Sequence, residues 1–385
     1  MAATGMLFPE ARTDDRQDYF AGLGVLPDHV LRQLIRDRAI TAATAVLDEQ
    51  VQPASLDLRL GTVAYRVRTS FLPGAAPVAR KIEQLAMHSM DLGDGAVLEK
   101  GCVYIVPLQE ELDLPKAIGG TANPKSTTGR LDIFTRLITD GATEFEVVPA
   151  GYRGQLYLEI SPRTFSILVR AGDRLNQLRL RRGVQRHPDT ILERLQDKEP
   201  LVFLSGDEAA KANISKGLWL RIDLKGEHGH ELIGYRAKPH TPLIDLRRIR
   251  HYEPDDFWEP IRRNRTASLI LNPGDFYILV SKEKVSIPPD HAAEMVAYDP
   301  SVGEFRIHYA GFFDPGFGYG DTRSGTPAVL EVRSHEVPFL LEDGQVVGRL
   351  VFEKLLQPPQ QLYGSAIGSS YAVQGLALSK HFKLT

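Results

Sequence analysis

Short apolar or alternating runs, separated by Gly and Pro, recur along the whole chain. They cover residues 55–60, 155–160, 165–169, 276–280, 328–332 and 346–352. Runs of this length, punctuated in this way, predict β-strands arranged in barrels or sandwiches. The runs at 155–160 and 165–169 predict a pair of neighbouring strands. The chain is therefore expected to be mainly β.

Helical periodicity is limited to short stretches. Residues 30–35 place their apolar side chains on one helical face and follow Pro27 and Asp28, which make a reasonable helix start. A charged stretch at 187–216 contains a second predicted helix at 191–195. We expect this stretch to connect two domains.

A long internal repeat supports two domains. Residues 97–104 (VLEKGCVY) resemble residues 270–277 (ILNPGDFY), and Pro115 matches Pro288 at the same spacing. Residues 157–159 (YLE) match 329–331 (VLE) at a spacing one residue shorter. A period this long indicates duplicated domains rather than a stack of small repeats.

Composition narrows the classes of function. Of the 385 residues, 43% are hydrophobic and 25% are charged, as in ordinary globular proteins. A net charge of −3 gives no reason to expect nucleic-acid binding. Cys102 is the one cysteine, which excludes an internal disulfide and a thiolate-based zinc site. We see neither a secretory signal nor a membrane span, so we expect a cytoplasmic protein.

The segment 125–130 (KSTTGR) carries groups that suit phosphate. Lys125 and Arg130 offer charge-assisted donors, Ser126 and Thr127 offer hydroxyls, and Gly129 allows close approach of the backbone. The order of residues differs from the Walker motif. The alternative interpretation is a solvated turn with incidental charges.

The second half carries a different constellation. Residues 309–317 (YAGFFDPGF) place small residues beside Asp314, which could accept a hydrogen bond from a sugar hydroxyl. Glu331 lies within an apolar strand, where burial would raise its pKa and suit it to proton transfer. The alternative is that the Asp-Pro-Gly segment is only a turn and Glu331 an exposed strand residue. We expect a structural role for the neighbouring His308.

Together these segments resemble the dCTP deaminase family of the dUTPase superfamily, in duplicated form. The family's phosphate motif, Arg-Ser-Ser-x-Gly/Ala-Arg, is similar to residues 125–130, and its ring-and-sugar motif is similar to 309–317. Its catalytic Leu-Glu falls on residues 330–331, and its amino-terminal strand resembles 52–61. The closing tail of the family resembles 363–375.

The resemblance implies a fold and a set of site residues. The fold is two dUTPase-like β-barrel or jelly-roll-type domains in tandem, with short helices. The expected organisation is a tail at 1–20, a first domain at 21–185, a bridge at 186–216, a second domain at 217–358 and a closing tail at 359–385. Glu331 would be catalytic. The substrate-binding residues would be Lys125, Ser126, Thr127, Thr128, Gly129, Arg130, Ala310, Asp314, Val329, Leu330, Tyr363 and Gln374.

The first half departs from the family where the second half agrees. Residues 148–152 (VPAGY) replace the family's Asp-Pro-Gly, so Glu159 has lost its companions. Ser370 stands where the family usually has a Lys near the phosphates. Since family sites lie between subunits, we expect one competent site that joins residues 125–130 to Asp314 and Glu331. The pairing of the second-half loop with Glu159 should be inactive. We expect a homo-oligomer, or a rearranged pairing within one chain.

The implied chemistry is hydrolytic deamination of dCTP to dUTP and ammonia without zinc. Glu331 would move the protons, and Mg²⁺ would arrive bound to the triphosphate. The alternatives are a dUTP pyrophosphatase, a bifunctional enzyme that makes dUMP from dCTP, and a non-catalytic nucleotide-binding regulator. The resemblance also suggests dTTP as an inhibitor, and neither nucleic acid nor membrane as a partner.

Overall fold

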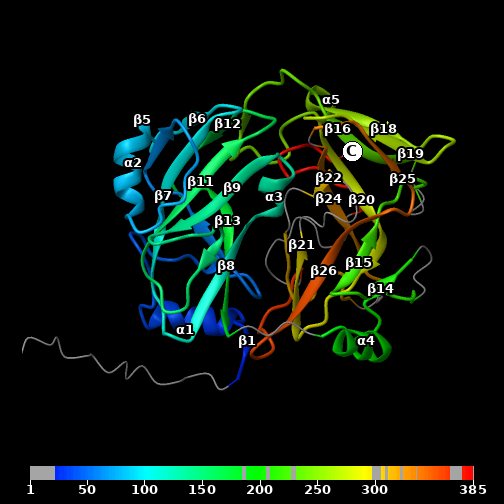
Figure 1. The fold of residues 1–385 in the computed structure, drawn as a ribbon, viewed down its shortest axis with the longest axis horizontal. Helices are drawn as coiled ribbons and strands as arrows, with labels where there is room; N and C mark the ends of the chain where they lie inside the picture. Colours follow the sequence, from blue (N-terminus) through cyan, green and yellow to red (C-terminus); the bar gives the residue numbers. More distant parts are fainter. Residues whose placement is uncertain are drawn as a thin grey trace, which may run out of the picture.

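The chain forms two similar β-rich halves that lie side by side, as the ribbon in Figure 1 shows. The computed structural model describes residues 22–183, 188–204, 209–226, 231–296, 305–307 (backbone only), 311–320, 324–334, 336–364 and 375–384. No helix within these residues has the length and apolar character needed to cross a membrane.

The first half is built on thirteen strands in the described part of the chain. They are β1 (Gly24–Val25), β2 (Ile40–Ala42), β3 (Leu56–Arg59), β4 (Val63–Val67), β5 (Ala86–Asp91), β6 (Ala96–Leu98), β7 (Val103–Asp113), β8 (Ile118–Pro124), β9 (Ile133–Thr139), β10 (Val147–Val148), β11 (Arg153–Pro162), β12 (Ile167–Val169) and β13 (Arg174–Arg182). Its helices are α1 (Asp28–Arg36), η1 (Asp48–Gln50), α2 (Val78–Leu85) and α3 (Ser126–Gly129). The predicted apolar face of α1 is confirmed, because Val30, Leu31 and Leu34 are buried.

The second half follows the same plan. Its strands are β14 (Val202–Phe203), β15 (Leu218–Arg221), β16 (Leu232–Ala237), β17 (Ile244–Asp245), β18 (Trp258–Arg262), β19 (Ser268–Leu271), β20 (Phe276–Val285), β21 (His291–Val296), β22 (Phe305–Ile307), β23 (Phe312–Phe313), β24 (Thr326–Ser334), β25 (Phe339–Glu342) and β26 (Val346–Lys354). Its helices are α4 (Asp189–Lys198), which contains the helix expected at 191–195, and α5 (Pro254–Phe257).

The internal repeat of the sequence corresponds to a repeat of topology. The sheet order β5-β4-β7-β11-β9 of the first half recurs as β18-β16-β20-β24-β22 in the second. The pair β6–β12 recurs as β19–β25. The register recurs too, because Glu159 lies opposite Ile105 and Glu331 lies opposite Ile278. The expectation of a duplicated, mainly β fold is confirmed.

The predicted pairing of residues 155–160 with 165–169 is wrong. The first run lies in β11, which pairs with β7 and β9 along most of its length. The second run contains β12, which pairs with β6 and, in parallel, with β17 from the second half. Both edges of β11 are occupied by long strands, so no edge remains there for β12.

The halves meet through the sheet that contains β8 and β13 and the sheet that contains β21 and β26. Asn123 on β8 donates its Nδ2 hydrogen to Glu294 Oε1 on β21 at 3.0 Å. Arg181 on β13 forms an ion pair with Glu353 on β26 at 3.1 Å. These contacts cross between the halves at strand positions and so fix their relative placement.

The C-terminal segment returns to the first half. Phe382 is buried in the same apolar core as the strands of the first half. Its ring centroid lies 5.3 Å from that of Phe257 and 5.9 Å from that of Trp258, both in edge-on geometry. The end of the chain therefore ties α5 and β18 of the second half to the core of the first.

We expect Phe382→Ala to lower the free energy of unfolding by about 3–5 kcal/mol, because it leaves a cavity in this aromatic cluster. Urea titration followed by fluorescence would measure the loss. Leu384→Ala is the matched control, since Leu384 is 66% exposed, and should change stability by less than about 0.5 kcal/mol. Equal effects of the two substitutions would contradict the anchoring role of Phe382.

Candidate active site

The segment Lys125 to Arg130, here called the phosphate loop, is held rigidly to the first half. It follows β8 directly, and α3 forms its single helical turn. The backbone N–H of Lys125 donates to Leu175 O at 3.0 Å, and the Thr128 hydroxyl donates to the same oxygen at 2.8 Å. Lys125 also forms an ion pair with the buried carboxylate of Asp57 on β3. The loop is thus preorganised by β3 and β13.

The Asp-Pro-Gly turn of the second half, Asp314-Pro315-Gly316, is equally well defined. The N–H of Gly316 donates to Ile287 O at 3.0 Å, and that of Phe317 donates to Asp314 O at 3.1 Å. Gly316 adopts a φ of +93°, and a Cβ there would lie 2.9 Å from Leu362 Cβ. Glycine is required because the chain before Tyr363 packs directly on this turn.

A buried arginine of the first half positions this turn of the second half. Arg179 on β13 has a fully buried side chain and donates to Asp314 Oδ1 at 2.8 Å. It also donates to Ala293 O at 2.9 Å, and its guanidinium lies 4.0 Å from the ring centroid of Phe312. Burial raises the pKa of Asp314, and Arg179 opposes that rise.

The catalytic carboxylate predicted from the sequence lies against the phosphate loop. Nε of Arg130 is 4.0 Å from Oε1 of Glu331, and both side chains are almost completely buried. Burial raises the pKa of Glu331 to about 7, while the positive charge of Arg130 limits the rise. A carboxyl group with such a pKa can both accept and donate a proton near neutral pH.

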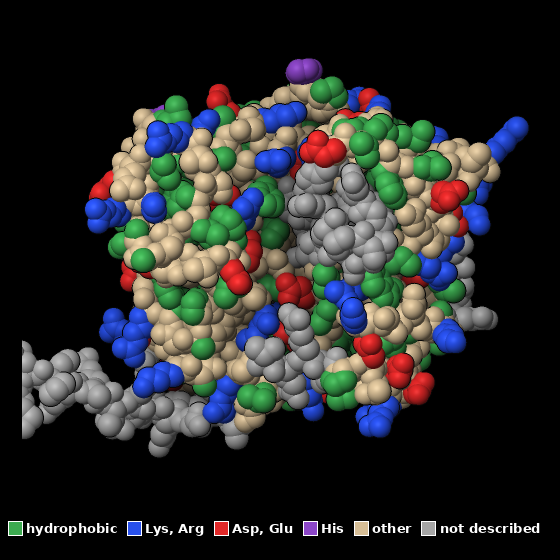
Figure 2. Space-filling model, viewed as in Figure 1, with side chains coloured by type: hydrophobic (Ala, Val, Ile, Leu, Met, Phe, Trp, Pro, Cys, Tyr) green, Lys and Arg blue, Asp and Glu red, His purple; other side chains and the backbone are tan. Residues whose placement is uncertain are grey.

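Other parts of the two motifs also converge. A Cβ added to Gly311 would lie 4.0 Å from Ser126 Oγ, so the ring motif approaches the exposed hydroxyl of the loop. Lys125 lies close enough to Asp314 to lower its pKa. Figure 2 shows a hollow where the two halves meet, with Lys and Arg side chains near its border. The phosphate loop, the Asp-Pro-Gly turn and Glu331 together form what we call the composite site.

Not every predicted contact residue faces this site. Val329 shares the face of β24 that carries Glu331 and packs against the first-half core, whereas Leu330 lies in the second-half core. Successive strand residues point to opposite faces, so the side chain of Leu330 points away from Glu331 and only its backbone is placed to contact a substrate. Thr128 and Gly129 are buried and shape the loop.

Of the two contacts predicted in the closing tail, Tyr363 lies in the described part of the chain and Gln374 does not. Tyr363 donates its N–H to Pro315 O at 2.8 Å, and its ring centroid lies 5.7 Å from that of Phe317. This places Tyr363 on the Asp-Pro-Gly turn. Ala310, His308, Ser370 and Gln374 lie outside the described residues.

The first half contains a remnant of the same arrangement. Leu114 donates its N–H to Tyr152 O and Tyr152 donates to Pro149 O, as Ile287 donates to Phe317 O and Phe317 to Asp314 O in the other half. Pro149 thus stands in place of Asp314. Glu159 is buried at the position equivalent to Glu331. Its neighbour is Arg136 of the same half, at 3.6 Å, rather than a loop arginine of the other half.

Sequence reasoning missed Arg179, Asp57 and the C-terminal residues near the phosphate loop. Ser379 donates its hydroxyl hydrogen to Thr127 O at 3.0 Å, and Arg130 Nη1 donates to Ala377 O at 3.0 Å. Arg179 sits within an alternating basic run, so only the three-dimensional contact distinguishes it. Among the described residues, no group of three or more His, Cys, Asp or Glu side chains is placed to hold a metal ion.

Comparison with known protein families assigns a domain model to each half of the chain. Residues 22–184 match the model of the 2'-deoxycytidine 5'-triphosphate deaminase N-terminal domain, and residues 188–382 match that of the C-terminal domain. The chain belongs to the dCTP deaminase family. Both halves of the repeat are thus covered by domains of one enzyme family.

Individual proteins named as dCTP deaminases are also similar to this chain. The crystal structure of 2'-deoxycytidine 5'-triphosphate deaminase from Agrobacterium tumefaciens is 53% identical, with a TM-score of 0.83 over 88% of this chain and 100% of that chain. The "dCTP deaminase, dUMP-forming" of Kocuria rhizophila is 28% identical over 197 residues, or 50% of this chain and 88% of that protein. The "dCTP deaminase" of Natronomonas pharaonis is 30% identical over 125 residues, or 32% of this chain and 60% of that protein.

We expect Arg130→Ala to shift the acid limb of the pH profile of kcat/KM for dCTP to higher pH. Removing the positive charge removes the effect that lowers the pKa of Glu331, so the pKa rises above about 7. The basic form, needed to accept a proton, then appears only at higher pH.

The same substitution should weaken dCTP binding by about 1.5–3 kcal/mol, the usual cost of losing a charged hydrogen bond. Arg163→Ala is the matched control, because the Arg163 side chain is exposed. If the pH profile of Arg130→Ala superposed on that of the parent protein, Arg130 would not influence the pKa of Glu331.

Proposed function

We propose that the chain hydrolyses dCTP to dUTP and ammonia at the composite site. The observation that carries this proposal is the position of Glu331, buried on β24 with a pKa raised to about 7 and 4.0 Å from Arg130. A proton-transfer group and a phosphate-binding cation are thus brought together from the two halves. This combination suits chemistry on the base of a nucleoside triphosphate.

Glu331 performs the proton transfers of the proposed reaction. Its carboxylate accepts a proton from water as the water oxygen bonds to C4 of cytosine. It passes this proton to the ring nitrogen, then takes the proton of the newly formed C4 hydroxyl and delivers it to the amino group, which leaves as ammonia. General acid–base assistance of this kind contributes about 10²–10⁴-fold to the rate.

The remaining groups of the composite site bind and orient the nucleotide. Asp314 accepts a hydrogen bond from the sugar hydroxyl, and Arg179 holds the carboxylate in place for it. Lys125, Ser126, Thr127 and Arg130 bind the phosphates through ammonium, hydroxyl and guanidinium donors. Ala310 and Gln374 remain predicted contacts from the family motifs.

A second candidate is a bifunctional reaction that ends at dUMP and pyrophosphate. The name of the Kocuria rhizophila relative, "dCTP deaminase, dUMP-forming", favours it. The two reactions differ in whether a second water cleaves the bond between the α- and β-phosphates. Quantifying ammonia and pyrophosphate in one dCTP reaction separates them, since deamination alone releases ammonia without pyrophosphate.

The substrate is expected to be the magnesium salt of dCTP, with the ion held mainly by phosphate oxygens and water. Omission of Mg²⁺ should therefore raise the KM for dCTP, because the triphosphate loses its charge neutralisation. Zinc-selective chelators should leave the rate unchanged. Stoichiometric zinc in active protein, detected by elemental analysis, would overturn the zinc-independent mechanism.

Two further features of the proposal concern assembly and inhibition. We expect a homo-oligomer in which each chain contributes its own composite site, and dTTP as a competitor of dCTP. Sedimentation velocity would test the oligomer, and the rate of dCTP turnover at increasing dTTP concentration would test the inhibition.

We expect Glu331→Gln to abolish ammonia release from dCTP while nucleotide binding persists. The amide keeps the shape of the side chain but cannot shuttle protons near pH 7. Glu159→Gln is the matched control at the equivalent strand position, and it should retain nearly full activity because Pro149 replaces the sugar-binding Asp there. If Glu159→Gln were inactive and Glu331→Gln active, our assignment of catalysis to the second half would be wrong.

A further inference from the structure

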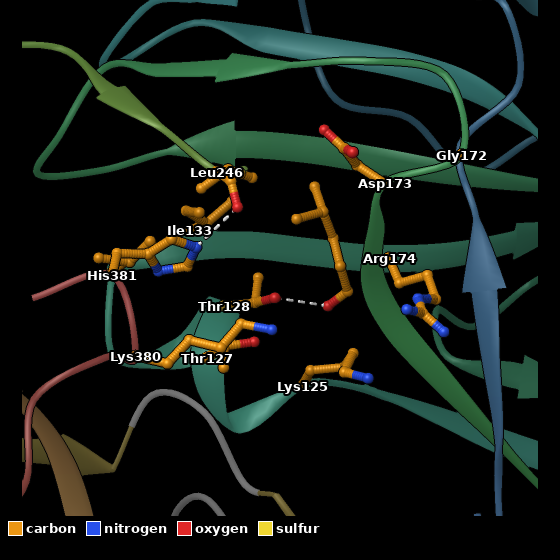
Figure 3. Close-up of a pocket in the computed structure, with 12 residues that line it drawn as sticks. Lys125, Thr127, Thr128, Ile133, Gly172, Asp173, Arg174, Leu246, Lys380 and His381 are labelled. Atoms are coloured by element: carbon orange, nitrogen blue, oxygen red, sulfur yellow. Dashed lines mark hydrogen bonds between the residues drawn. The ribbon is translucent and has the colours of Figure 1, made fainter. Parts of the chain in front are cut away.

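A cavity of about 180 Å³ lies beside the phosphate loop and is lined by three cationic side chains. Lys125 comes from the loop, Arg174 from β13 and Lys380 from the C-terminal segment. Figure 3 shows these residues, with Thr127 and Thr128, around the same space. None of the family motifs quoted above includes Arg174 or Lys380.

The backbone fixes Lys380 at this position. The N–H of Arg250 donates to Lys380 O at 2.9 Å, and the preceding Ser379 bonds through its hydroxyl to Thr127 O at 3.0 Å. Phe382 is buried two residues further on. The segment is therefore attached to the phosphate loop on one side of Lys380 and to the apolar core on the other.

The cations converge although they repel one another. Burial lowers the pKa of Lys380, and the charges of Lys125 and Arg174 lower it further. Asp57, which pairs with Lys125, and Glu49, which pairs with Arg174 at 2.9 Å, partly oppose this fall. Asp173 also lines the cavity, but its Oδ1 accepts from Arg247 at 2.9 Å and its Oδ2 accepts from the N–H of Arg170 at 2.7 Å. An anion in the cavity would relieve this repulsion.

The direction of the phosphate loop indicates which anion fits. Arg130, at the end of the loop, faces Glu331, where the base must lie for the proposed reaction. Lys125, at the start of the loop, faces the cavity. A nucleotide with its base at Glu331 therefore extends its phosphate chain along the loop towards Lys125.

We propose that Lys380 and Arg174 join Lys125 in binding the terminal phosphates of the triphosphate, so that the enzyme distinguishes triphosphates from monophosphates. The assignment to a nucleotide rests on the proposed function. The binding chemistry itself requires only a polyphosphate anion.

The test compares Lys380→Gln with Lys380→Arg and with Lys383→Gln in full-length protein that also carries Glu331→Gln. Lys383 lies on the same segment and pairs with the exposed Glu253, so its substitution removes an equal charge outside the cavity. Calorimetry would measure Kd for dCTP, dCMP and inorganic tripolyphosphate, and thermal melting would verify folding.

Lys380→Gln should weaken dCTP and tripolyphosphate binding about 10- to 100-fold and leave dCMP binding unchanged. Lys380→Arg should restore most of the affinity, and Lys383→Gln should match the parent. Equal weakening of dCTP and dCMP, or no weakening of either, would overturn the proposal. If the wild-type chain released no ammonia from dCTP, the proposed function would fail, whereas Lys380-dependent tripolyphosphate binding would still support the anion site.

Discussion

The composite site depends on one buried interaction, the contact of Arg179 with the other half of the chain. Its side chain is completely buried, donates to Asp314 Oδ1 at 2.8 Å and to Ala293 O at 2.9 Å, and stacks on Phe312. A buried charge that loses its partner costs about 3–5 kcal/mol, so the two halves are strongly held in this one arrangement. The Asp-Pro-Gly turn is thereby placed against the phosphate loop.

The duplicated halves diverged at the positions that build this contact. Val351 occupies the register position in β26 that Arg179 occupies in β13, since they pair with the equivalent residues Glu294 and Thr121. Pro149 replaces Asp314 in the first-half turn although its backbone hydrogen bonds are retained. Both halves thus keep the fold, whereas the full set of predicted site groups occurs in one combination of the halves.

The buried carboxylates illustrate the same divergence. Glu331 has its cationic neighbour, Arg130, in the loop of the other half. Glu159 instead lies 3.6 Å from Arg136 of its own half, and the Arg136 guanidinium packs between the rings of Phe134 and Phe145. Burial raises the pKa of Glu159 as well, so a raised pKa does not distinguish the two carboxylates. The groups that surround them differ.

The sequence was sufficient to predict features that depend on local pattern. The strand position of Glu331, the turn at Asp314 and the cationic loop at Lys125 follow from periodicity and residue type, as does the duplication. The pairing of β12 with β17, and the contacts of Arg179 and Lys380, could not be predicted. They join residues far apart in the chain, and nothing in the local pattern of β13 or of the C-terminal segment indicates their partners.

The claim that the working site forms within one chain, from both halves, has a direct test. Glu331→Gln is expected to be inactive and Arg130→Ala to bind dCTP weakly, so each releases little ammonia at low dCTP concentration. The two variants can be unfolded together and refolded as a mixture to allow exchange between chains. Our account predicts that the mixture shows only the sum of the two residual activities, because no chain contains both intact groups. Recovery of a substantial fraction of parental ammonia release would show that Arg130 and Glu331 meet between chains, and would contradict the account.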